Sequence, residues 1–367
     1  MAIAGGNITL DSTEGMDKIS QTEKVTSPYF SDGSTTLAAA NIVSSSLTDT
    51  NETYFFGISN SSTPTVEEFN VAFGSTNGYG SNDDANAIKA PTDAIYKQYA
   101  NLLLAPTEVT GGFHISSQGS SGALSTKDSE IFVLTARRSN MKDRINKGTW
   151  TIALSGSNTA GTGHPMLELT DDSVNSNPTA TPAGDRYNIV SGSAGTVVTG
   201  HEATVKNYGF FYPDMGILVF SQAELSASIP GKGANKAETV QFDNVEHQGF
   251  VVSTDVDNNE KTALRFINCL SNNTGPKLTF RDEEDQVSAQ YFCRVRSGHM
   301  NFSNNPTYVS GSLNELRQTT MKGNPTTFIS QVQLYNTAGE MVAVGNLSTP
   351  LKKNFSSEAT IKVKLTY

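Results

Sequence analysis

Histidine, which commonly binds metals and transfers protons, is scattered along this chain of 367 residues. Two histidines placed two or four positions apart would project from one side of a strand or helix, where they could share a metal ion. No pair of the five has either spacing. They are His114, His164, His201, His247 and His299. We therefore predict no metal site from these residues.

The two cysteines are each embedded in apolar sequence. Cys269 lies in the run LRFINCL, and Cys293 lies in YFCRV. A cysteine in such a run is typically a small buried hydrophobic residue. The N-terminal MAIAGG lacks the basic segment and the apolar core of a secretory signal. We therefore expect no export and no disulfide.

Two acidic segments could bind a cation. The segment that starts at Asp255 resembles a calcium loop, but Glu260 stands where the turn needs glycine and Phe266 stands where a bidentate acid is needed. The calcium prediction therefore fails. The acidic run at 282–285 is interpreted as a solvated turn, with cation binding as the alternative.

Phosphate-binding and nucleophile motifs are missing as well. Gly231-Lys232 lacks the upstream glycine of a phosphate loop, and the glycines at 191–195 are followed by Val197 and Val198, which do not start a helix. The sequence has no nucleophile elbow. We expect a non-enzymatic protein without a cofactor, although a pair of catalytic carboxylates would leave no local motif.

The charge balance argues against nucleic-acid binding. The net charge is −10 and the pI is about 5.0, whereas proteins that coat nucleic acid carry a basic patch. The short basic cluster at 137–144 is interpreted as a solvated turn or an ion-paired subunit contact. The candidate contact residues are Arg137, Arg138, Lys142, Arg144, Lys352 and Lys353.

Several segments alternate between apolar and polar residues, as half-buried strands do. The clearest is 359–367, where Ile361, Val363 and Leu365 alternate with lysine and threonine. Charged residues make up 17% of the chain, against about 25% in typical domains. No apolar run approaches the roughly 18 residues of a membrane span. We predict a mainly β fold (α+β), an antiparallel sandwich or barrel-like sheets with a few helices.

The clearest helix is predicted over 92–104. Thr92 is its expected N-cap, and Pro106 ends it. One face has apolar residues at helical spacing, namely Ile95, Tyr99, Leu102 and Leu103. Two weaker helical patterns, at 236–246 and 259–270, lie in a more charged segment.

These patterns divide the chain into four segments. The first is polar and is expected to be an arm with short strands that lies on a neighbouring subunit. The third is the charged, partly helical insertion. The segments are an N-terminal arm (1–50), a β-rich core with the helix at 92–104 (51–221), the insertion (222–290) and C-terminal strands that complete the core (291–367).

An ordered series of segments resembles a family of virion structural proteins of large contractile-tailed phages, especially those that infect cyanobacteria. The resemblance covers most of the chain and is weakest at about 222–285. Its segments include FNVAFGSTNGYGS at 69–81, PTDAIYKQYANLLL at 91–104, EIFVLTARRSNMKDRINKGTWTIALS at 130–155, RYNIVSGSAG at 186–195, YGFFYPDMGILVF at 208–220, YFCRVRSGHMNFSNNPTYVSGS at 291–312 and VQLYNTAGEMVAVGNLSTPLKKNFSSEATIKVKLTY at 332–367. The last one also resembles a module of tail-fibre and baseplate-attachment proteins.

The resemblance implies a structural component of the phage particle, assembled in the host cytoplasm. It points to the baseplate of the contractile tail, with the neck or the head surface as alternative locations. The implied partners are other tail, baseplate or neck proteins and copies of the chain itself, without nucleic acid or membrane. It implies no reaction.

A glycan-binding tail protein is the other class of function. Such a site needs exposed aromatic rings beside carboxylates. The nearest local candidates are Tyr208, Phe211, Tyr212 and Asp214. Trp150, the only tryptophan, lies in a predicted core strand, which disfavours this alternative.

Overall fold

The computed structural model describes residues 17–30, 42–44, 55–60, 63–78, 91–109, 112–115, 127–154, 167–200, 202–203, 206–226, 263, 266, 270, 278–302, 306–310 and 315–367. In this part of the chain strands far outnumber helices, which confirms the predicted mainly β class. The chain forms two compact units. The core unit comprises Val25–Glu284, and the terminal unit comprises Met1–Lys24 with Asp285–Tyr367.

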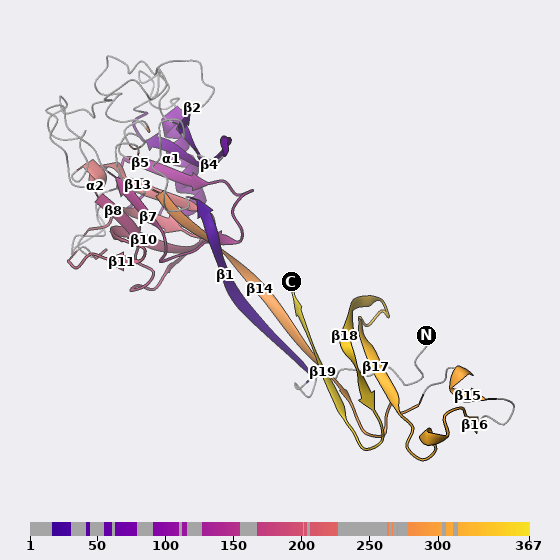
Figure 1. Ribbon diagram of the computed structural model, residues 1–367. Helices are drawn as coiled ribbons and strands as arrows, with labels where there is room; N and C mark the ends of the chain where they lie inside the picture. The colour runs from indigo at the N-terminus through magenta and orange to yellow at the C-terminus, as the bar shows by residue number, and fades with distance from the viewer. Residues whose placement is uncertain are drawn as a thin grey trace. The chain divides into compact units, whose positions relative to one another are not determined.

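The core unit is built on one large antiparallel sheet (Figure 1). Its strands follow the hydrogen-bonded order β14-β7-β8-β10-β12-β13-β5-β4-β3-β2, with β6, β9 and β11 paired beside this path. The strands are β2 (Ile42–Ser44), β3 (Phe55–Asn60), β4 (Thr63–Ser75), β5 (Glu130–Ala136), β6 (Arg144–Ile145), β7 (Thr151–Leu154), β8 (Leu167–Asp171), β9 (Thr179–Thr181), β10 (Gly184–Ser193), β11 (Thr196–Val197), β12 (Gly209–Tyr212) and β13 (Ile217–Ser221).

Two long strands continue from one unit into the other. They are β1 (Lys18–Phe30) and β14 (Leu278–Val295), which are neighbours in the sheet. The core unit also contains helices α1 (Pro91–Leu103) and α2 (Gln222–Ser226).

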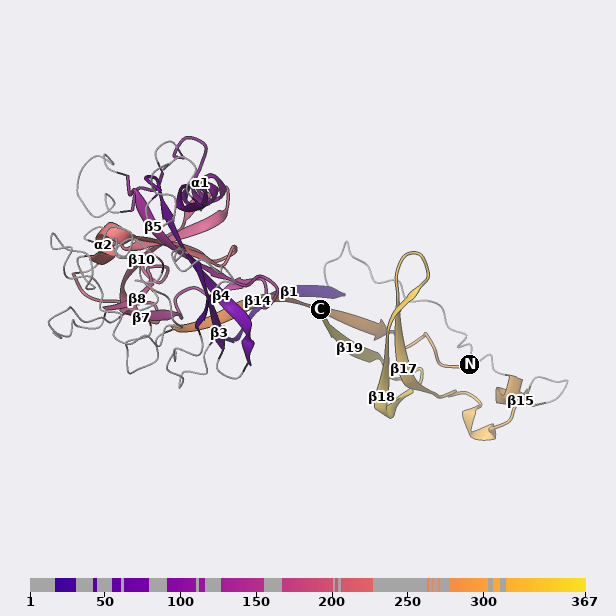
Figure 2. The ribbon, with the colours of Figure 1, turned by 90° about the horizontal axis from the view of Figure 1, so that it is seen from above.

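The central strands of the sheet are buried on both faces. In β5, Ile131 and Val133 point towards α1, while Phe132 and Leu134 point into the larger hydrophobic cluster on the other side. Figure 2 shows α1 beside β5. Because both faces are covered, β5, β12 and β13 are nearly continuous apolar runs. The expected buried strand at 131–135 is confirmed.

Aromatic contacts join strands that are far apart in the sheet order. Phe280 of β14 stacks on Trp150 with ring centroids 5.6 Å apart, and it packs against Phe69 of β4 at 4.9 Å. Trp150 also meets Phe211 of β12 edge-on at 5.3 Å. The sheet therefore curls around its core without a hydrogen-bonded barrel closure among the described strands.

Helix α1 starts one residue earlier than predicted and buries a different face. Pro91 occupies the first helical position, where its missing N–H costs nothing, so Thr92 lies inside the helix and the N-cap prediction is wrong. The predicted face had Ile95, Tyr99, Leu102 and Leu103, but Leu102 is exposed and Ile95 and Tyr99 are half-buried. The buried residues are Thr92, Asp93, Tyr96, Ala100 and Leu103.

Tyr96 selects this face. Its hydroxyl donates to the carbonyl of Asp128 (2.5 Å) and accepts from the N–H of Phe113 (3.0 Å). The helix backbone also lies against Gly74 of β4, where an added Cβ would stand 3.0 Å from the Tyr96 nitrogen and Cα. Hydrophobic spacing within 91–104 cannot predict these contacts, since they depend on two distant segments.

The predicted helical insertion is described at three positions. Ala263, Phe266 and Leu270 are helical and buried, in agreement with the predicted helix at 259–270. The ring of Phe266 packs against Phe132 (5.4 Å) and Phe220 (5.3 Å). The predicted helix at 236–246 and Cys269 lie outside the described residues.

The described terminal unit contains part of the large sheet and two separate two-stranded sheets. The second half of β14 pairs antiparallel with β19 (Ala359–Thr366), from Ser288 opposite Thr366 to Val295 opposite Ala359. A hairpin joins β17 (Thr327–Tyr335) to β18 (Met341–Lys353). Shorter elements are β15 (Val309–Ser310), β16 (Glu315–Leu316) and the 3₁₀ turns η4 (Pro306–Tyr308) and η5 (Thr319–Met321).

The loop of the β17–β18 hairpin holds five residues, since its last strand pair is Tyr335 with Met341. The predicted domain division differs from the contacts of the terminal unit. Residues 291–367 were expected to complete the core of 51–221, whereas the contacts group 285–367 with 1–24. The predicted arm at 1–50 is described only at β1 and β2 and at Asp17, and the 13 residues of β1 exceed the short strands expected there.

The buried tyrosines of the core unit lead to a prediction about alkaline pH. Burial raises the pKa of Tyr96 and that of Tyr212 to about 12, against 10.0 for an exposed tyrosine. Above pH 10 the unfolded chain loses these protons first, so stability should fall as the pH rises from 10 towards 12. Tyr96→Phe should lower the unfolding free energy by about 2 kcal/mol at pH 8. Its further loss between pH 10 and 12 should be smaller than that of the wild type in urea titrations, and an equal loss would contradict the assignment.

Candidate functional site

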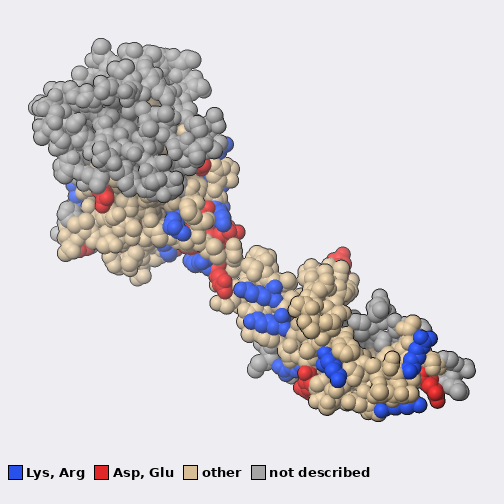
Figure 3. All heavy atoms as spheres, in the orientation of Figure 1, with Lys and Arg blue, Asp and Glu red and all other residues tan. Residues whose placement is uncertain are grey.

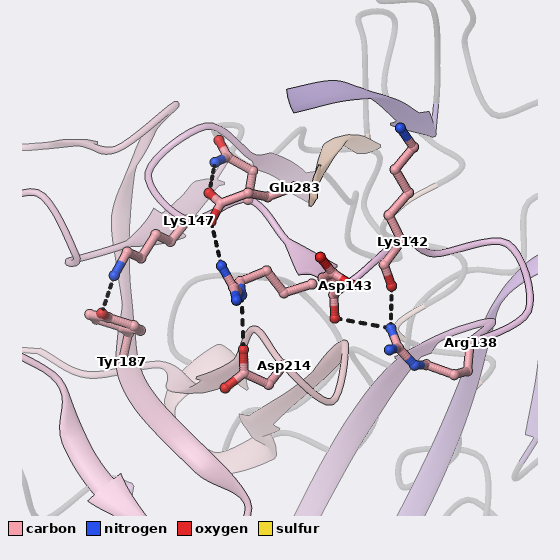
Figure 4. Close-up of polar contacts among 9 residues, drawn as sticks. Arg138, Lys142, Asp143, Lys147, Tyr187, Asp214 and Glu283 are labelled. Atoms are coloured by element: carbon pink, nitrogen blue, oxygen red, sulfur yellow. Dashed lines mark hydrogen bonds and ion pairs between the residues drawn. The ribbon is translucent and has the colours of Figure 1, made fainter. Parts of the chain in front are cut away.

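The predicted basic turn is largely occupied by contacts within the core unit. Arg144 donates from its NH1 group to Glu283 (2.7 Å) and from Nε to Asp214 (3.2 Å) (Figure 4). The Glu283 side chain is only 5% exposed and also accepts from the side-chain amide of Asn146 (2.6 Å). Arg144 therefore fastens β14 to the β12–β13 turn, and this buried pair is an internal contact.

The neighbouring basic residues lie closer to solvent. Arg138 donates to the carbonyls of Lys142 and Asp143, the latter at 3.0 Å, and so holds the turn closed. Arg137 donates to the Glu67 carbonyl (3.3 Å). Lys142 forms an exposed pair with Glu284 (2.7 Å). The prediction that these three basic residues touch another subunit stays a prediction.

The acidic run at 282–285 is part of strand β14, so its interpretation as a solvated turn is wrong. Asp282 and Glu283 are buried, and Asp282 accepts from the hydroxyl of Ser27 in β1 (2.5 Å). A hydroxyl from Ser27, a guanidinium from Arg144 and a side-chain amide from Asn146 offset the desolvation of these two acids. Among the described residues, no group of three His, Cys, Asp or Glu side chains is arranged to hold a metal ion.

Other buried acids hold loops in place. Asp171 accepts from the N–H of Gly148 at 2.9 and 3.0 Å, and burial raises the pKa of its carboxyl. Asp172 accepts from the backbone and side-chain amides of Asn188. Asp128 accepts from the N–H of Ile115 (2.8 Å). These hydrogen bonds explain why the three acids are buried without any catalytic role being needed.

The aromatic residues considered for glycan binding lie in the core. Tyr208, Phe211 and Tyr212 are buried, so their rings offer no stacking surface. Asp214 is half-exposed and paired with Arg144. The residues are close together in the sequence, but the fold buries the three rings in the core.

Of the two lysines predicted as contacts near the C-terminus, Lys352 and Lys353, only Lys352 is exposed. Lys353 is fully buried and donates to the carbonyls of Ser297 (2.9 Å) and Asn354 (2.9 Å) and to the side chain of Asn301 (2.8 Å). Burial lowers the pKa of its ammonium group. Lys353 is thus an internal anchor at the base of the β17–β18 hairpin, and its prediction as a surface contact is wrong.

The feature that sequence reasoning missed is the exposed apolar surface of the terminal unit. Ten of the fourteen exposed large apolar residues that the structure describes belong to this unit. They are Ile19, Phe302, Phe328, Tyr335, Met341, Val342, Val344, Leu351, Phe355 and Tyr367. The described residues of this unit bury only three apolar side chains, those of Ala289, Val295 and Ala359.

The two units also differ in charge. The terminal unit has ten Lys and Arg against eight Asp and Glu, whereas the core unit has sixteen against twenty-eight. Figure 3 shows several Lys and Arg side chains on the viewed face of the terminal unit. The apolar surface therefore belongs to a unit with little net charge, on a chain that is acidic elsewhere.

Cys293 is half-buried rather than fully buried as expected, and burial raises the pKa of its thiol. None of the helices that the structure describes is long and apolar enough to span a membrane. Comparison with known proteins finds no matching family model, no similar curated protein and no similar solved structure.

Removing Arg144 should destabilise the core unit. Arg144→Met leaves Glu283 buried without its cation and should lower the unfolding free energy by about 3 kcal/mol. Urea titration followed by the fluorescence of the buried Trp150 measures this change. Lys142→Met is the matched control, because it breaks an exposed pair and should leave the midpoint within error. Equal effects of the two variants would contradict the anchoring role of Arg144.

Removing Lys353 should loosen the β17–β18 hairpin. Lys353→Met keeps an unbranched apolar side chain but deletes three hydrogen-bond donations. Amide hydrogen exchange in β17 and β18 should accelerate by on the order of tenfold, while exchange in the core unit stays unchanged. The exposed neighbour supplies the control, since Lys352→Met should leave the hairpin as protected as in the wild type. Unchanged exchange in Lys353→Met would exclude the anchor.

Proposed function

We propose that this chain is a non-enzymatic structural subunit of a tailed-phage particle, a component of the contractile-tail baseplate that acts by packing against other subunits. The observation that carries the proposal is the terminal unit, whose described residues expose ten large apolar side chains and bury three small or medium ones. Exposed apolar surface on this scale is typical of interaction surfaces.

The hairpin geometry supports permanent rather than passing contacts. A two-stranded hairpin without a covering layer is at best marginally stable in water. Nearly every residue of β17 and β18 is exposed or half-exposed. Packing against neighbours would supply the missing layer, as in obligate assemblies, whose interfaces often exceed about 2,000 Å².

The location in a phage particle is supported by the resemblance of the ordered segments to virion structural proteins. Those segments include both the aromatic strands of the core unit and the hairpin of the terminal unit. The neck and the head surface are alternative locations that require the same packing mechanism. The acidic core unit favours solubility before assembly.

The proposal predicts that the chain enters particles and that its terminal unit contributes to entry. A tagged full-length chain, produced in cells that make the particles, should co-sediment with purified particles and be labelled by immunogold at the tail end. Because assembly would bury the exposed ring of Phe328, Phe328→Ser should reduce the occupancy of the chain in particles by about tenfold or more. Val174→Ser, at an equally exposed site of the core unit, is the control and should enter normally. A wild-type chain that stays out of the particles would overturn the proposal.

A further inference from the structure

We propose that the exposed face of the β17–β18 hairpin binds the terminal unit of a second copy of this chain. This inference deepens the proposed function, because it names one of the subunits against which the chain packs. The face is defined by the residue pairs Tyr335 with Met341, Gln333 with Val344 and Gln331 with Asn346.

This face combines apolar side chains with an ordered row of amides. Tyr335 and Met341 are exposed by 54% and 56%, and Val344 by 52%. The Tyr335 hydroxyl donates to Gln333 (2.6 Å), and the Gln333 amide donates to Gln331 (2.9 Å). The polar groups are therefore already paired with one another, so covering the face would cost little in lost hydrogen bonds.

The base of the hairpin is held by the rest of the terminal unit. Lys353 ties it to the turn at Ser297 and to Asn301, and the hydroxyl of Thr327 donates to the carbonyl of Met300. A surface that is fixed before binding loses less conformational entropy when it docks. The hairpin is thus an exposed element with a fixed base.

The apolar complementarity favours a second terminal unit as the occupant. The described part of the core unit exposes only four large apolar residues, namely Val25, Leu102, Val174 and Val198. The other ten exposed ones lie on the terminal unit, so the described apolar surface able to match the hairpin is the same unit of another copy. A surface that meets its own copy is the commonest basis of a closed oligomer.

Charge favours the same pairing. The core unit has a formal excess of twelve negative charges, whereas the terminal unit has an excess of two positive charges. Two core units would repel each other at low salt, while two terminal units would meet with little repulsion. Self-association through the terminal unit should therefore persist when salt is raised.

Sedimentation velocity of the full-length chain tests the inference. The wild type should form dimers or larger species at micromolar concentration, in 0.1 M and in 1 M NaCl. Met341→Thr combined with Val344→Thr should weaken association by about tenfold or more while keeping strand-forming residues. Val174→Thr combined with Val198→Thr is the matched control and should associate like the wild type. Trp150 fluorescence checks that each variant keeps a folded core.

A measurement without substitutions gives a second readout. Amide exchange of the wild type should slow in β17 and β18 as protein concentration rises through the association range, with little change in β5 and β13. The inference would be overturned if the chain stays monomeric. It would also be overturned if rising concentration protects only amides outside the terminal unit. Particle entry of a monomeric chain would leave the proposed function standing, so the two proposals can fail separately.

Discussion

The stack of Phe280 on Trp150 is the contact on which the rest of the core unit depends. It brings β14 against the aromatic interior, and the adjoining contact of Phe280 with Phe69 reaches β4, seven places away in the sheet order. Each ring buries a large apolar area, and tilted or offset aromatic pairs add to this burial. Contacts between side chains of β14 and β4, which lie far apart in the sheet order, close the larger of the two hydrophobic clusters.

The partners of the acidic residues on β14 depend on how deeply each acid is buried. Glu283 follows Phe280 on β14 and accepts hydrogen bonds from Arg144 and Asn146. The next acid, Glu284, forms a solvent-exposed ion pair with Lys142. The same strand thus carries a buried, costly ion pair and an exposed, weak one on successive residues. Lys142 and Arg144 of the basic turn meet this demand of β14, while Arg137 and Arg138 donate to backbone carbonyls elsewhere.

Burial changes sharply between the two units. The core unit covers both faces of its central strands, while the described strands of the terminal unit leave most of their side chains at least partly exposed. Strands that bury so little apolar area need further burial against another molecule to offset the entropy lost when the chain is ordered. This requirement links the architecture to the proposed assembly role and to the proposed contact between copies.

The sequence by itself determined the mainly β class, the buried strand at 131–135 and the existence of a helix near 92–104, because hydrophobic spacing is a local property. It could not determine which face α1 buries, since the Tyr96 hydroxyl is fixed by donating to the carbonyl of Asp128 and accepting from the N–H of Phe113. Nor could it tell that Lys353 is buried or that Arg144 is paired internally, because charge alone says nothing of depth. The alternation at 361–367 predicted a strand correctly, but only the tertiary structure showed that ten large apolar side chains of the terminal unit are left exposed by the described part of the chain. Alternation records which side of a strand is apolar, and burial depends on what the fold brings against that side.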